Sequence, residues 1–260
     1  IEKASEKELS FFYEKPLCSS VEEAQAISEI TDLSKVTAMV GYIYRFAPVF
    51  EQIKDIIDQN IVGQIYSAFF RIGGRGSHQP WKHQRAMNGG ALNEMAVHMI
   101  DLALWYFNHI ENIEILCDKL LQPVRTIQGR ELDVDAEDYI LLRGHSKSGT
   151  EILIQADMIT PAFSQYLEIQ GDNGSIFASI QTDRPSYLFL KEGRGNWPAG
   201  KTILEVGESN LFHRQMREFL DAVKNRRQPN NCTLDDSVRI MQLINYINEQ
   251  RCQNLIGKQI

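Results

Sequence analysis

Residues 89–101, which read GGALNEMAVHMID, give the strongest indication of the fold. On a helix that advances about 100° per residue, Glu94, His98 and Asp101 fall within roughly 60° of one another. The continuation to Phe107 has no other charge, which predicts a largely buried helix with one narrow ionisable stripe. That stripe is either the one line of the helix that faces water or a set of side chains that faces a functional site.

The sequence before this helix predicts a single βαβ unit. Residues 10–13 form a β-prone run, residues 20–23 fit a capping box that opens a helix, and residues 36–42 are apolar enough for a strand covered on both faces. The tripeptide Glu14-Lys15-Pro16 follows the first strand directly. A lysine at the carboxyl end of a parallel strand lies where open α/β sheets bind ligands, although an ordinary turn with a solvated lysine has the same pattern.

The sequence after residue 47 predicts a different architecture. A helix over 48–60, a strand over 65–72 and an irregular segment over 73–88 lead into the quoted stretch. From residue 113 onward successive strands are joined by short turns, so we expect them to pair antiparallel, and two helices over 211–224 and 237–249 close the chain. We therefore predict an α+β fold, with a remnant of a parallel α/β domain followed by a domain with a large, mainly antiparallel open sheet.

Composition excludes several classes of partner. The 260 residues carry a formal net charge of -7 and no basic cluster, which argues against binding to a nucleic-acid backbone. No apolar run reaches the length of a membrane span, and the four scattered cysteines contain no Cys-x-x-Cys pair. We expect a cytoplasmic protein. Because the sequence opens on Ile1, in what reads as the end of a helix, we also expect it to be part of a longer protein.

Three motifs are candidates for ligand-binding sites. Residues 195–202 match the phosphate-loop pattern, but a β-prone run follows where a helix should begin, and residues 74–79 lack the third glycine of a dinucleotide fingerprint. Glu94 and His98 have the spacing of a metal-binding pair, and His78 and His83 lie upstream. No second ligand pair has suitable spacing, so we predict no metal site.

Taken together, the motifs resemble the Gfo/Idh/MocA family, the glucose–fructose oxidoreductase and inositol dehydrogenase group. The resemblance lies in residues 14–17 (EKPL), 45–50 (RFAPVF), 89–101, 169–175 (IQGDNGS) and 212–220, which occur in the order that the family shows. Two residues depart from the family pattern. Glu94 stands where the family has Asp, and Ala96 stands where the family has Gly. The first strands of the Rossmann domain, with their glycine fingerprint, are absent from this sequence.

The resemblance implies a division into domains and a reaction. Residues 1–44 would be the terminal βαβ part of a Rossmann domain, and residues 45–260 the substrate and oligomerisation domain. The reaction implied is hydride transfer between NAD or NADP and a hydroxyl or keto carbon of a sugar, sugar derivative or cyclitol. The antiparallel sheet would join subunits into a homodimer or tetramer.

The resemblance also implies roles for individual residues. Lys15, Glu94 and His98 would be catalytic, with His98 as the general base or acid, and the turn from Glu14 to Pro16 would contact the cofactor. Weaker candidates for the substrate pocket are Arg45, Trp81, His83 and His213. The alternative hypothesis is a non-catalytic sugar-binding or dimerisation module, a degenerate relative without the cofactor half.

Overall fold

The computed structural model describes residues 2–34, 36–75, 79–207 and 210–256. The chain divides into two compact units. The first unit comprises residues 1–47 and 208–260, and the second comprises residues 48–207. The two C-terminal helices thus belong to the first unit by their contacts, whereas the division at residue 44 remains a prediction about the Rossmann and substrate domains.

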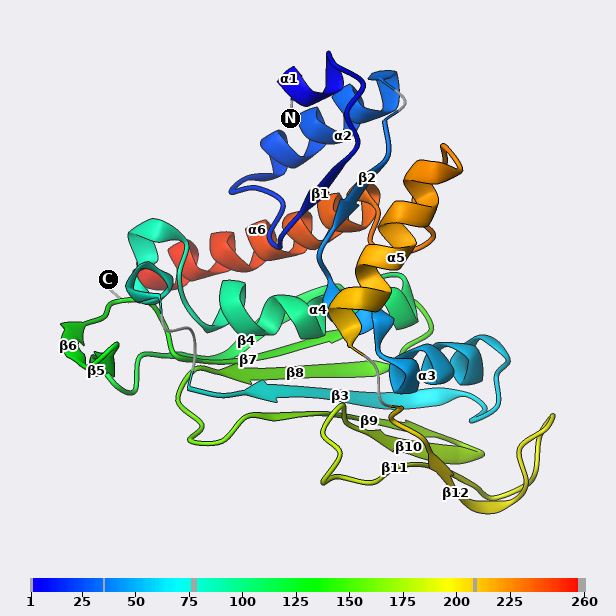
Figure 1. The fold of residues 1–260 in the computed structure, drawn as a ribbon. Coiled ribbons are helices and arrows are strands. Elements are labelled where there is room, and N and C mark those ends of the chain that lie inside the picture. Colours follow the sequence, from blue (N-terminus) through cyan, green and yellow to red (C-terminus); the bar gives the residue numbers. More distant parts are fainter. Residues whose placement is uncertain (1, 35, 76–78, 208–209, 257–260) are drawn as a thin grey trace. The chain divides into compact units, whose positions relative to one another are not determined.

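The first unit is built on a two-stranded parallel sheet. Its elements are α1 (Glu2–Ser5), β1 (Phe11–Tyr13), α2 (Val21–Ser34), β2 (Ala38–Val40), the 3-10 turn η1 (Ile43–Phe46), α5 (Leu211–Lys224) and α6 (Leu234–Ile256). Phe11 of β1 lies opposite Ala38 of β2 in parallel register, so the predicted βαβ unit is confirmed. Helix α2 packs along α6 (Figure 1), and Phe12 of β1 meets Phe219 of α5 edge to face, with ring centroids 5.9 Å apart.

The two C-terminal helices begin at hydrogen-bonded caps. The Asn210 side chain accepts from the His213 backbone N–H at the start of α5. At the start of α6, Thr233 Oγ1 accepts from the Asp236 N–H, and the Asp236 carboxylate accepts from the Thr233 N–H. This reciprocal cap satisfies two backbone donors that the helix itself leaves free. It starts α6 at Leu234, three residues before the predicted start at Ser237.

The second unit is dominated by an eight-stranded sheet in the order β12-β11-β10-β9-β3-β8-β7-β4. Among its pairings β3 and β8 run parallel and the others run antiparallel, as the mainly antiparallel prediction requires. The expectation that successive strands pair is wrong for β8 and β9, because β3 lies between them. The strands are β3 (Ile65–Gly73), β4 (Glu111–Lys119), β7 (Tyr139–His145), β8 (Glu151–Asp157), β9 (Ser164–Gly171), β10 (Gly174–Ala178), β11 (Ser186–Leu190) and β12 (Gly200–Leu204).

One face of this sheet is covered by helices α3 (Pro48–Asp58) and α4 (Val97–Phe107) (Figure 1). Phe70 of β3 stacks on Tyr106 of α4 with centroids 6.2 Å apart, and the Tyr106 hydroxyl donates to the Phe50 carbonyl over 3.1 Å. The buried aromatic ring and its satisfied hydroxyl fix α4 against both the sheet and α3.

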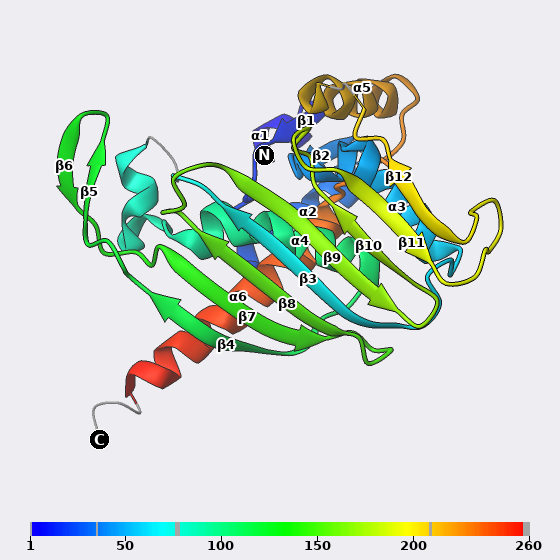
Figure 2. The ribbon, with the colours of Figure 1, turned by 90° about the horizontal axis from the view of Figure 1, so that it is seen from below.

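Figure 2 shows the opposite face of the sheet, over which no described helix of the second unit lies. Here an aromatic row crosses four strands. Phe69, Tyr166, Phe177 and Tyr187 follow one another with centroids 5.9, 5.5 and 5.9 Å apart. Lys201 Nζ lies 4.1 Å from the Tyr187 ring centroid at the edge strand.

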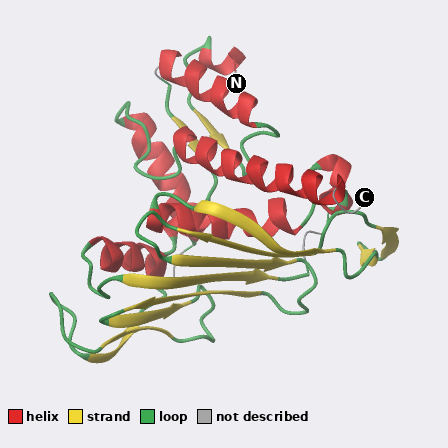
Figure 3. Cartoon of the chain, turned by 180° about the vertical axis from the view of Figure 1, so that it is seen from behind, coloured by secondary structure: helices red, strands yellow, loops and turns green. Residues whose placement is uncertain are grey.

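Two further elements of the second unit depart from the sequence prediction. The hairpin of β5 (Val124–Ile127) and β6 (Arg130–Asp133) projects from the main sheet (Figure 3). Its turn has positive φ at both Gln128 and Gly129, as a two-residue hairpin turn demands, but Gln-Gly is a weaker signal than Asn-Gly. The other is β12, which begins at Gly200 inside the phosphate-loop match. Lys201 therefore lies in a strand, and no helix begins there to bind phosphate.

Among the residues that the structure describes, no helix is both long and apolar enough to span a membrane.

Candidate functional site

The helix that carries His98 begins with an unusual turn. Residues Leu92–Ala96 are π-helical, and the Val97 N–H donates to the Leu92 carbonyl five residues back. Such turns are rare and frequently occur at functional sites. The π turn precedes α4 directly, so the constant advance of 100° per residue assumed in the sequence analysis does not hold around Glu94.

The three side chains of the ionisable stripe differ in burial. Asp101 is only 1% exposed, while Glu94 and His98 have intermediate exposure. The stripe therefore runs from the protein interior at Asp101 to partly accessible positions at Glu94 and His98. A functional role for these side chains remains a prediction.

Glu94 forms an ion pair with Lys82. The Lys82 ammonium lies 2.9 Å from each carboxylate oxygen of Glu94, and the two side chains are 25% and 18% exposed. Lys82 comes from the 3-10 turn η2 (Pro80–His83), and its Nζ lies 5.4 Å from the Trp81 ring centroid. Sequence reasoning missed Lys82, because the two partners are separated by an irregular segment with no periodicity that would bring them together.

Trp81 and His83, two of the weaker substrate candidates, have different environments. Trp81 is 46% exposed, so its indole presents a broad apolar surface to solvent. His83 is 3% exposed, and its Nδ1 lies 2.9 Å from Arg125 Nη1. Because a guanidinium only donates, Nδ1 must accept, which assigns the ring to the neutral tautomer with hydrogen on Nε2.

Arg125 ties together the segments around this loop. Its Nη2 donates to the Arg75 carbonyl over 2.8 Å and also to the Met158 carbonyl. Burial lowers the pKa of Arg125, and the charges of Asp138 and Asp157 partly oppose that effect. The projecting β5–β6 hairpin is thus attached through β5 to the loop that leads into the His98 helix. Arg125 has no recognisable motif around it, so this contact could not be predicted from the sequence.

The tripeptide from Glu14 to Pro16 lies in the first unit, directly after β1. The Lys15–Pro16 peptide bond is cis, and Lys15 has intermediate exposure. The Gly41 N–H donates to the Tyr13 carbonyl over 2.7 Å, which continues the pairing of the two strands up to this turn. Lys15 therefore follows the carboxyl end of a parallel strand, the position that the sequence predicted for it.

Arg45 and His213, the remaining weaker candidates, also belong to the first unit. Arg45 is 3% exposed, and its guanidinium lies 3.0 Å from the Asp236 carboxylate at the start of α6. Burial alone would raise the pKa of Asp236, but Arg45, the Thr233 N–H and Arg239 outweigh it and hold the pKa below its usual value. His213 is exposed in the first turn of α5. A substrate contact by either residue remains a prediction.

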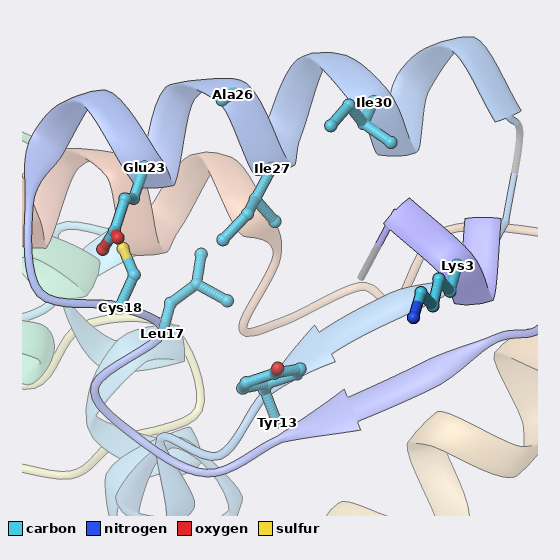
Figure 4. Close-up of a pocket in the computed structure, with 8 residues that line it drawn as sticks. All are labelled: Lys3, Tyr13, Leu17, Cys18, Glu23, Ala26, Ile27 and Ile30. Atoms are coloured by element: carbon cyan, nitrogen blue, oxygen red, sulfur yellow. The ribbon is translucent and has the colours of Figure 1, made fainter. Parts of the chain in front are cut away.

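A cavity of about 560 Å³ lies in the first unit beside β1 and α2 (Figure 4). Its lining is mainly apolar, with the Cys18 thiol among the polar groups. Burial raises the pKa of the Cys18 thiol, the hydrogen bond to the Ser20 backbone lowers it, and the charge of Glu23 raises it further. Because the net change is an increase, the thiol is protonated at neutral pH and is a poor nucleophile. The other lining residues are Lys3, Tyr13, Leu17, Glu23, Ala26, Ile27 and Ile30.

Within the described residues no group of three His, Cys, Asp or Glu side chains is arranged to hold a metal ion. His78, one of the further ligands considered from the sequence, lies outside the described residues. Contacts join Trp81, Lys82 and Glu94 of the second unit, and His98 follows Glu94 by four residues along the same helical segment. These four residues carry an aromatic ring, an ammonium, a carboxylate and an imidazole, and their role in a site remains a prediction.

Curated proteins from two bacteria are similar to this chain. Levoglucosan dehydrogenase of Pseudarthrobacter phenanthrenivorans is 24% identical over 250 residues, which cover 81% of this chain and 64% of that protein. The scyllo-inositol 2-dehydrogenase (NAD(+)) of Bacillus subtilis is 26% identical over 243 residues, covering 92% of this chain and 67% of the relative. The chain thus spans about two thirds of the length of these relatives.

Solved structures show the same fold. A levoglucosan dehydrogenase in complex with NADH superposes with a TM-score of 0.82 at 19% identity, over 97% of this chain and 74% of that one. An aldose-aldose oxidoreductase from Caulobacter crescentus, complexed with glycerol, gives a TM-score of 0.78 at 16% identity, over 97% and 73% of the two chains.

The family comparison is the most extensive. Residues 54–254 match the family described as "Oxidoreductase family, C-terminal alpha/beta domain", the GFO_IDH_MocA_C family. This match covers more than half of the sequence and includes the whole of the helix that carries His98. The resemblance inferred from the motifs is confirmed, and the chain belongs to the Gfo/Idh/MocA oxidoreductase family.

Proposed function

We propose that this chain provides the substrate-binding and proton-transfer residues of an NAD(P)-dependent oxidoreductase. Its substrate would be a sugar, sugar derivative or cyclitol, and the reaction would take place at a hydroxyl or keto carbon of that molecule. The observation that supports this most strongly is the Lys82–Glu94 ion pair one turn before His98, on a helix that the family comparison includes. The names of the relatives, which are dehydrogenases of an anhydrosugar and of inositols, support the substrate class.

In this proposal His98 accepts the hydroxyl proton as hydride leaves the substrate carbon, and returns it in the reverse direction. An imidazole has an ordinary pKa of ~6.5, which suits proton transfer at neutral pH. Glu94 stabilises the protonated imidazole and is itself held by Lys82. Trp81 offers an apolar face against which the C–H face of a sugar ring can pack.

The nicotinamide cofactor supplies the hydride acceptor. The first unit fits part of such a site, because β1 and β2 are parallel and Lys15 follows the carboxyl end of β1, where open α/β sheets bind dinucleotides. Lys15 would hold the substrate oxygen electrostatically as negative charge develops on it. The glycine fingerprint that binds the pyrophosphate is not among these 260 residues, so the rest of the cofactor site must come from elsewhere.

The open face of the large sheet supports a proposal for assembly. Phe189 and Ile203 are about half exposed next to the aromatic row of Phe69, Tyr166, Phe177 and Tyr187. A contiguous apolar surface of this kind on a sheet is typical of an interface. We propose that two copies pack these faces together as a homodimer, with a tetramer as the larger alternative.

The test compares this chain with the protein translated from the complete reading frame. Both are titrated calorimetrically with NAD⁺ and NADP⁺ and assayed by nicotinamide absorbance against a panel of cyclitols and anhydrosugars. We expect no measurable cofactor binding by this chain, and binding with turnover by the longer protein. If the reading frame begins where this sequence begins, and the chain binds sugars without oxidising them, the non-catalytic sugar-binding module replaces the enzyme.

A further inference from the structure

Glu137 lies in the segment between β6 and β7 and is 2% exposed. Its carboxylate reaches the start of the helix that carries His98. Oε1 accepts from the Leu92 N–H over 3.0 Å, and the backbone carbonyl of the same residue accepts from the Ala91 N–H over 2.8 Å. A buried carboxylate is costly unless it is hydrogen-bonded, so these contacts fix both Glu137 and the helix start.

Gly90 makes room for this arrangement. It has φ +114°, in the region that favours glycine, and a Cβ added to it would lie 2.6 Å from both carboxylate oxygens of Glu137. Any side chain at this position would therefore displace the carboxylate as well as strain the backbone. Gly90, the second residue of the Gly-Gly pair, thus allows the Glu137 carboxylate to approach the start of the helix.

The contact is transmitted along the backbone to the proposed catalytic residue. Leu92, whose N–H donates to Glu137, accepts through its carbonyl the π-type bond from Val97. Val97 directly precedes His98, and Glu94 lies within the same π turn. The carboxylate is therefore bonded to the one turn whose geometry sets the directions of the Glu94 and His98 side chains.

We propose that Glu137 is a positioning residue that holds the π turn in register, so that Glu94 and His98 are correctly placed for proton transfer. The inference rests on the proposed function for its kinetic consequence, but the anchoring itself does not. A misplacement of catalytic groups by about 1 Å can cost ~10²-fold in rate, so loss of the anchor should lower kcat without abolishing substrate binding.

The test uses Glu137→Ala, Glu137→Gln and Gly90→Ala, with Asp138→Ala as the matched control. Asp138 is the neighbouring buried carboxylate and also accepts from backbone N–H groups, but from Leu121 and Gln122 at 2.8 Å rather than from the His98 helix. Two properties are measured for each variant. They are the hydrogen exchange of individual backbone amides in this chain, and kcat with KM in the protein from the complete reading frame.

We expect amides of residues 92–97 to exchange at least ~10-fold faster in Glu137→Ala and Gly90→Ala than in Asp138→Ala, whose own effect lies at residues 121–122. We expect kcat to fall by ~10-fold or more in the first two variants, with KM within ~3-fold of the wild type. Glu137→Gln should recover most of both properties, because its amide oxygen still accepts from the Leu92 N–H.

Unchanged exchange over residues 92–97 in Glu137→Ala would overturn the proposal. So would an equal loss of kcat in Asp138→Ala, because the effect would then be one of general stability. Failure of the proposed function has a different signature. Substitution of His98 would leave turnover normal, whereas the exchange measurement would still decide whether Glu137 anchors the π turn.

Discussion

At the scale of single residues, Glu94 is defined by its ion pair with Lys82, whose ammonium lies 2.9 Å from the carboxylate. The pair joins the π turn that precedes His98 to the 3-10 turn η2, which supplies Lys82. Both side chains keep some exposure to solvent, so we expect the pair to contribute only modestly to the free energy of unfolding.

Lys82→Met should release Glu94 and thereby disturb the support of His98. We expect kcat/KM to fall by ~10-fold or more, whereas the free energy of unfolding changes by only about 1 kcal/mol. Lys54→Met is the matched control, because Lys54 forms its ion pair with Asp58 within one helix, away from the site. Steady-state kinetics and urea unfolding measure the two quantities. Equal kinetic losses in both variants would contradict a specific role for Lys82.

The Arg45–Asp236 pair predicts a pH dependence of stability. The folded pKa of Asp236 lies below its ordinary value, so its contribution is fully present above the unfolded pKa of ~3.9 and is lost as the pH falls through the folded pKa. Asp236→Asn should therefore be less stable than the wild type at neutral pH, and the two curves should converge in acid. Urea unfolding across the pH range measures both curves, and parallel curves would contradict the assignment.

At the scale of elements, turns of the second unit are fixed by buried polar side chains. Asn173, in the turn between β9 and β10, donates through Nδ2 to the carbonyls of Ile61 and Glu192, and its Oδ1 accepts from the Glu192 N–H. One side chain thus connects three segments that are far apart in the sequence. Hairpin turn residues predict the turn itself, but not the neighbours that the turn will join.

Asn173→Ala should remove these hydrogen bonds and leave backbone groups unsatisfied in a buried place. We expect a loss of about 2–4 kcal/mol in the free energy of unfolding. Asn225→Ala is the control, because exposed Asn225 makes only local bonds to Asp221 at the end of α5 and should cost under ~1 kcal/mol. Denaturant unfolding distinguishes them, and equal losses would show that the turn does not join the segments energetically.

The elements show where prediction from the sequence succeeds. Strand β7 and helix α5 have the predicted bounds, because polar turns or caps mark both of their ends. The π turn over residues 92–96 could not be predicted, since it depends on the Glu137 carboxylate reaching Leu92 from another segment. For the same reason the sequence relates Glu94 to His98 but not to Lys82, because helical periodicity relates residues only within one element.

At the scale of the whole molecule, the open face of the sheet predicts self-association. Phe189→Glu places a charge among the exposed aromatic residues of that face and should shift the protein toward monomer in sedimentation velocity at micromolar concentration. Phe212→Glu is the control, because Phe212 is exposed on α5 of the first unit. Dissociation by Phe212→Glu but not by Phe189→Glu would place the interface elsewhere. Circular dichroism should show both variants folded.

The central claim is that His98 transfers the proton in a nicotinamide-dependent oxidation. It is tested most directly by the turnover of His98→Gln in the protein from the complete reading frame, at saturating cofactor and substrate, with exposed His109→Gln as control. We predict that kcat falls by at least ~10²-fold in His98→Gln, with cofactor affinity and the His109→Gln rate unchanged. A rate for His98→Gln within ~3-fold of the wild type would contradict it.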